Sequence, residues 1–188
     1  DAAGANTTGG AIIAIGDTAY DAADTENYNI AIGTDALGGA VAGGEYNVAV
    51  GHFSLDALTS GDNNTAVGYN AGSGLTEGVS NTAVGFEAMG AGTITGSENE
   101  AFGRRALKNL TSGAGNVAVG TEALLDITSG SQNVAVGKLA LENCNSGGNN
   151  VAVGYTALRN NTGDGNVAVG KEAGLANTSG TGIIAIGS

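Results

Sequence analysis

The stretch Asn116-Val117-Ala118-Val119-Gly120 decides the fold, because close copies of it recur along the whole chain of 188 residues. Its closing glycine returns every 16 to 18 residues. The closing glycines are Gly16, Gly33, Gly51, Gly68, Gly85, Gly103, Gly120, Gly137, Gly154, Gly170 and Gly187. A short, fixed period is typical of repeat architectures in which each unit stacks on the next.

The composition fits a narrow core that is repeated many times. One unit of about 17 residues is too small for a core of its own, so residues 1–188 are expected to form a single repeat array. We expect an irregular N-terminal cap over about residues 1–10 and coils over about residues 11–188. The chain has 35 Gly and no Pro, so every coil keeps the backbone N–H groups that it needs to bond to the next coil.

The charge disfavours two classes of partner. A formal net charge of -12, from 18 acids and 6 bases, disfavours nucleic acid and anionic membrane surfaces. No apolar stretch approaches the ~20 residues of a membrane span, so no membrane insertion is expected. Cys144 is the only cysteine, which excludes an internal disulfide. The start at Asp1 rather than Met favours a processed or excised segment.

The central motif reads as a short strand with two apolar faces. Ala118 lies on one face, and Val117 and Val119 lie on the other. The Ala position is Ala in all eleven copies, which predicts a cramped coil interior. The Val/Ile face needs a second cover, and the same face of another identical chain is the simplest one. The position of Val117 is Thr65, Thr82 or Glu100 in three copies, so it is expected near the edge of that contact.

The rest of the unit predicts how the coil closes. An Ala-Leu pair such as Ala123-Leu124 closes it from the opposite side, and a second glycine, such as Gly113, marks a polar corner. The Asn residues that open each motif are expected to form a ladder of amides. The predicted fold class is all-β, a parallel β-solenoid (β-roll) of about eleven short coils. At roughly 4.8 Å per coil the rod is on the order of 50 Å long, with no room for a full helix in each unit.

Residues 64–71 (NTAVGYNA) and 116–124 (NVAVGTEAL) resemble the repeats of phage tail fibres and related surface fibre proteins. They are also similar to the shorter repeats of trimeric autotransporter adhesin heads. This resemblance implies a homotrimer of parallel β-rolls with the Val/Ile strand facing the shared axis, in an extracellular virion tail fibre or on a cell surface. The implied trimer seam comprises Val50, Val67, Val84, Phe102, Val119, Val136, Val153 and Val169.

The residues that follow the closing glycine are the candidates for binding. They vary between copies, and a corner tolerates functional side chains without disturbing the stack. The predicted ligand-binding residues are His52, Phe53, Tyr69, Phe86, Arg104, Arg105 and Tyr155. The expected ligand is a cell-surface glycan or a protein receptor, which three copies of each site bind by avidity.

Catalytic motifs are incomplete, so no enzyme activity, cofactor or metal is predicted. Residues 165–171 match most of a phosphate-binding loop, but Glu172 stands where Ser or Thr holds magnesium. His52 and Cys144 are the only residues of their kinds and lie several coils apart, which disfavours nucleophilic catalysis. Acidic residues keep no single register of the kind that calcium-binding β-rolls show.

Three alternatives stay open beside the non-catalytic fibre segment. One is a bacterial trimeric autotransporter-type adhesin head. Another is a polysaccharide-cleaving tailspike, in which carboxylates on adjacent coils or chains pair across a cleft. The last is an ice-binding solenoid that uses a partial Thr ladder, comprising Thr59, Thr111, Thr128 and Thr178.

Overall fold

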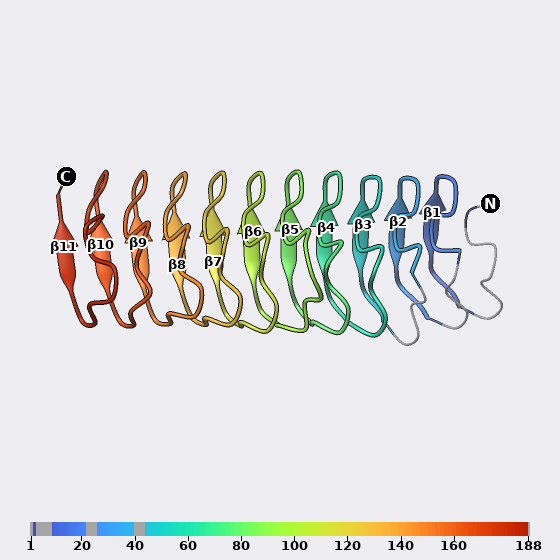
Figure 1. The fold of residues 1–188 in the computed structure, drawn as a ribbon. Helices are drawn as coiled ribbons and strands as arrows, with labels where there is room; N and C mark the ends of the chain where they lie inside the picture. The colour runs from blue at the N-terminus through green and yellow to red at the C-terminus, as the bar shows by residue number, and fades with distance from the viewer. Residues whose placement is uncertain (1, 3–8, 22–25, 40–43, 188) are drawn as a thin grey trace.

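The structure is a computed structural model that describes residues 2, 9–21, 26–39 and 44–187 (Figure 1). In this part of the chain every copy of the motif forms a three-residue strand. The strands are β1 (Ile13–Ile15), β2 (Ile30–Ile32), β3 (Val48–Val50), β4 (Thr65–Val67), β5 (Thr82–Val84), β6 (Glu100–Phe102), β7 (Val117–Val119), β8 (Val134–Val136), β9 (Val151–Val153), β10 (Val167–Val169) and β11 (Ile184–Ile186). The predicted N-terminal cap lies largely outside the described residues.

The strands form one parallel sheet in chain order from β1 to β11. Equivalent positions pair with each other, as Val117 with Val134 and Ala118 with Ala135. The coils stack into a rod with β1 and β11 at opposite ends (Figure 1). The described residues contain no helix, and therefore none that could span a bilayer. The prediction of a parallel β-solenoid with coils of about 17 residues is confirmed.

The coil interior is a narrow column of small and branched side chains. Ala118 points inward and is fully buried, as are Ala123 and Leu124 from the opposite wall. A third buried position, which the sequence analysis missed, lies between the Ala-Leu pair and the corner glycine, as at Leu110 and Ile127. Stacking these positions from coil to coil makes one continuous core along the rod.

The predicted amide ladder forms inside this core. The amide nitrogen of Asn116 donates to Asn99 Oδ1 of the preceding coil at 3.0 Å and to the carbonyl of Gly130 in the following coil at 2.9 Å. Asn116 is fully buried, and a buried amide requires such partners. The ladder therefore ties each strand to the coils on both sides.

The two glycine positions serve different purposes. Gly120, the closing glycine, has a φ of +131°, and a Cβ there would lie 2.7 Å from the carbonyl oxygen of Gly137. Gly113, at the polar corner, has no left-handed backbone, but a Cβ would lie 2.2 Å from the carbonyl oxygen of Gly130. The prediction of two recurring sites of positive φ or close backbone approach is confirmed.

Left-handed backbone also occurs at residues other than glycine, and the sequence analysis did not predict it. Glu122 has a φ of 59° and Leu124 a φ of 50°. Their N–H groups point in opposite directions along the rod. Glu122 donates to the carbonyl of Arg104 at 2.9 Å, and Leu124 donates to the carbonyl of Ala140 at 3.0 Å. These bonds to both neighbouring coils offset a conformation that costs roughly 1–2 kcal/mol per residue.

Candidate functional site

One side of the rod carries nearly all of the exposed apolar side chains. Exposure alternates from the residue before the ladder Asn to the residue after the closing glycine, so side chains at every second position point outward. We call these outward positions together the outward face. Of the 14 large apolar residues exposed in the described chain, all except Val79 lie on the outward face. They are Ile13, Ile15, Tyr28, Tyr46, Val67, Tyr69, Phe86, Phe102, Val119, Tyr155, Val169, Ile184 and Ile186.

The predicted trimer seam lies along the middle of the outward face. Its most exposed members are 37% to 41% accessible in the single chain. They are Val67, Phe102, Val119 and Val169, whereas Val50, Val84, Val136 and Val153 are half-buried. Thr65, Thr82 and Glu100 share this face, on three consecutive strands. The single chain thus leaves the Val/Ile face uncovered, as the sequence analysis expected.

The structure brings three of the predicted ligand-binding residues together at the strand-end edge of this face. The Tyr69 and Phe86 rings are stacked, with centroids 5.4 Å apart and planes 13° apart. Phe53 meets Tyr69 edge to face at 6.0 Å. Tyr69 and Phe86 remain 48% and 44% exposed. These two ring contacts join the three residues into an apolar ridge across adjacent coils.

A second aromatic pair lies at the strand-start edge and was missed by the sequence analysis. Tyr28 and Tyr46 stack at 5.0 Å with planes 4° apart, and each is 53% exposed. Both directly precede a ladder Asn, and this shared register was the available signal. The outward face is therefore edged with aromatic rings on both sides.

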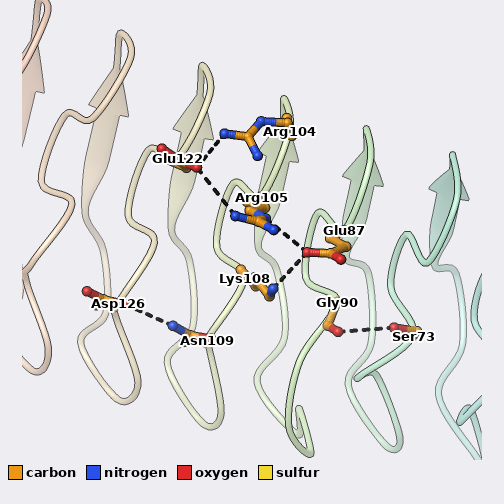
Figure 2. Close-up of polar contacts among 9 residues, drawn as sticks. All are labelled: Ser73, Glu87, Gly90, Arg104, Arg105, Lys108, Asn109, Glu122 and Asp126. Carbon is orange, nitrogen blue, oxygen red and sulfur yellow. Dashed lines mark hydrogen bonds and ion pairs between the residues drawn. The ribbon is translucent and has the colours of Figure 1, made fainter.

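The predicted cationic residues belong to an ion-pair cluster (Figure 2). Arg104 contacts Glu122 at 2.5 Å, and Arg105 lies between Glu87 at 3.0 Å and Glu122 at 3.8 Å. Lys108 completes the cluster at 2.7 Å from Glu87. The Lys108 hydrogen bond, aided by Arg105, holds the pKa of Glu87 below its usual value. Arg104 and Arg105 are thus partly engaged within the chain.

Of the remaining predicted site residues, His52 lies beside the aromatic ridge and Tyr155 lies apart from it. His52 is exposed in the coil of β3, next to Phe53. Tyr155 is 46% exposed, but it follows β9, four strands beyond β5, whose end Phe86 follows. The structure therefore divides the predicted binding residues into a central group and a separate tyrosine.

The structure also shows where the residues of the phosphate-loop, nucleophile, ice-binding and metal hypotheses lie. Residues 167–169 of the phosphate-loop-like stretch form strand β10. Cys144 is buried between β8 and β9, and burial raises the pKa of its thiol to about 11. The hydroxyls of Thr59, Thr111 and Thr128 donate to carbonyls of the next coil at 2.8 to 3.0 Å. Within the described chain, no three His, Cys, Asp or Glu side chains converge as metal ligands.

No family model, curated protein or solved structure matches this chain.

Proposed function

We propose that the chain is a non-catalytic structural and adhesive fibre segment, extracellular on a virion tail fibre or a cell surface. In this proposal three copies assemble side by side through the outward face, and the exposed edges contact a glycan or protein on a host or other surface. The observation that carries the proposal is the one-sided distribution of exposed apolar residues, 13 of 14 of which lie on the outward face.

The size of the outward face supports association of copies. It runs along eleven strands in register, which is about 48 Å at ~4.8 Å per strand. Monomeric soluble proteins rarely expose a contiguous apolar patch of more than a few hundred Å². Covering the face removes apolar area from water at about 25 cal/mol per Å². The face supports association as such, and the number three comes from the resemblance to tail-fibre repeats.

The edges of the face support the adhesive part of the proposal. Aromatic rings are enriched where proteins contact ligands, because they offer large contact area at little entropic cost. The ridge of Phe53, Tyr69 and Phe86 lies at a corner, where side chains vary without disturbing the stack. Three chains repeat the ridge three times, so shallow individual contacts add up through avidity.

A charge placed in the face tests the proposal. Val119→Asp puts a carboxylate among apolar side chains of neighbouring copies, which is expected to dissociate the assembly in sedimentation velocity. Ser112→Asp is the matched control, because Ser112 is exposed at the polar corner of the same coil. We expect the control to sediment as the wild type does. Equal sedimentation of both variants and the wild type would contradict the assembly.

A further inference from the structure

We propose that the outward face specifies parallel packing of its copies through an intermolecular ion pair at β6, in which Glu98 and Glu100 of one copy meet Arg104 of the next. This inference rests on the proposed assembly and adds to it the charged residues that select the direction and register of the chains. It assigns a partner-selecting role to three charged residues of the outward face at β6, the sixth of the eleven strands.

The coil of β6 carries opposite charges at the two edges of the outward face. Glu98 and Glu100 lie at the strand-start side, Phe102 follows, and Arg104 lies just beyond the strand end. All four side chains are exposed. No other coil has a charged residue at both edge positions, those of Glu98 and Arg104. The other coils pair them as Ala11 with Asp17, Tyr28 with Thr34, Tyr46 with His52, Asn63 with Tyr69, Ser80 with Phe86, Gly115 with Thr121, Gln132 with Lys138, Asn149 with Tyr155, Gly165 with Lys171, and Gly182 with Ser188.

The two carboxylates have no cation of their own. Among the ion pairs of the described residues, none involves Glu98 or Glu100. The strands on either side place Thr82 and Val117 opposite Glu100, and neither residue is charged. The carboxylates are therefore free to pair with a neighbouring copy.

Arg104 supplies the matching positive charge. Its cluster contains three cations, Arg104, Arg105 and Lys108, against two carboxylates, Glu87 and Glu122, which leaves a net charge of about +1 (Figure 2). Arg104 is the most exposed of the three cations, at 46% of its side chain against 37% and 26%. The surplus positive charge thus lies at the outer edge, where a carboxylate from another copy can approach.

Symmetry decides which charges meet. Rotation about an axis along the rod keeps the rods parallel and brings the strand-start edge of one copy beside the strand-end edge of the next, coil by coil, at the solvent-accessible rim of the interface. Glu98 and Glu100 then face Arg104. Antiparallel packing in register places β6, the sixth of eleven strands, against β6 with start edge facing start edge, so the carboxylates oppose one another. The charges favour the parallel arrangement and disfavour the antiparallel one.

The net negative charge of the rod disfavours the parallel arrangement. The ion pair therefore has to outweigh repulsion between the rods. Of the 18 acids, 13 precede Arg104, whereas all 6 bases lie from Arg104 onward. Parallel packing aligns these acidic halves. At physiological ionic strength the Debye length is about 8 Å, which screens repulsion between exposed charges on different rods more than contacts within an ion pair.

Charge reversal on each side of the pair tests the inference. Arg104→Glu, or Glu98→Lys with Glu100→Lys, leaves like charges facing each other, and we expect the association constant from sedimentation equilibrium to fall at least about tenfold. The combined variant with all three reversals restores opposite charges and is expected to recover most of that loss. Recovery is decisive, because Arg104→Glu also loses its contact with Glu122 in the same chain. Glu77→Lys, an exposed reversal away from the outward face, is the control.

A disulfide test reports the direction of the chains. In a Cys144→Ala background, Tyr28→Cys and Thr34→Cys lie at opposite edges of one coil, and an added oxidant joins them between copies only in parallel packing at the same level. Wild-type association with no recovery in the combined variant, or with no cross-link, would overturn the inference and leave the proposed assembly standing. A single-chain mass for the wild type would overturn both.

Discussion

The side-chain oxygen of Asn116 accepts two hydrogen bonds from Asn133 of the next coil, one from its backbone N–H and one from its amide, both at 3.0 Å. The same relationship continues from Asn133 to Asn150 at 3.0 Å. Each ladder residue therefore satisfies the backbone at the start of the following strand. This sets the register of the parallel sheet from inside the core.

Removing one step of the ladder is expected to be costly. Asn116→Ala leaves the Asn133 N–H and the Gly130 carbonyl buried without these partners, and an unsatisfied buried group costs about 1–3 kcal/mol. We predict a loss of about 3–5 kcal/mol in the free energy of unfolding, measured in urea. Asn145→Ala, at an exposed position, is the control and is expected to change it little. Equal losses would mean that the ladder contributes nothing specific.

Two glycine substitutions separate backbone strain from close approach. Gly115→Ala meets no atom closer than 3.7 Å, so it carries only the left-handed conformation, at about 1–2 kcal/mol. Gly120→Ala adds a Cβ at 2.7 Å from the carbonyl oxygen of Gly137. We predict that Gly120→Ala lowers the thermal midpoint far more than Gly115→Ala, because the stack must open to admit the methyl group. Similar midpoints would show that the coils tolerate a wider spacing.

The thiol of Cys144 is expected to be unreactive in the folded protein. Burial raises its pKa from 9.0 to about 11, so the thiolate is scarce at pH 8. A thiol reagent should modify Cys144 rapidly in urea and slowly without it. The raised pKa also means that stability falls as the pH rises between about 9 and about 11, where only the unfolded chain releases the proton. Rapid modification of the native protein would contradict the placement of Cys144 in the core.

The aromatic ridge is predicted to carry surface attachment. Tyr69→Ala and Phe86→Ala each remove one member of the stacked pair, and both are expected to weaken attachment to host cells or an immobilised glycan at least about tenfold through lost avidity. Val79→Ala trims an exposed apolar side chain that lies off the outward face and serves as the control. Attachment that is unchanged in all three variants would remove the ridge from the binding surface.

The strand and its two faces were predictable because the side chains of a strand alternate between two faces, and every copy places Ala between two larger side chains. The amide ladder was predictable because Asn recurs at one register position. Leu124 and Glu122 were not predictable as left-handed residues, since neither residue type favours that conformation and only the bonds to adjacent coils select it.

The candidate site was less accessible to sequence reasoning. Tyr69 and Phe86 share a register position, so their contact follows from stacking alone. The pairing of Arg104 and Arg105 with Glu122 and Glu87 joins different positions of different coils, and it appears only when the coils are built. Tyr28 and Tyr46 share the register position before the ladder Asn, so their contact also follows from stacking, although only residues after the closing glycine were predicted to bind.

Sedimentation equilibrium of the wild-type chain over a range of concentrations measures whether three copies assemble. We predict a mass of three times the 18.0 kDa chain, because three copies cover one another's outward faces. A mass of 18.0 kDa at every concentration would contradict it and leave the Val/Ile face as a surface for some other partner.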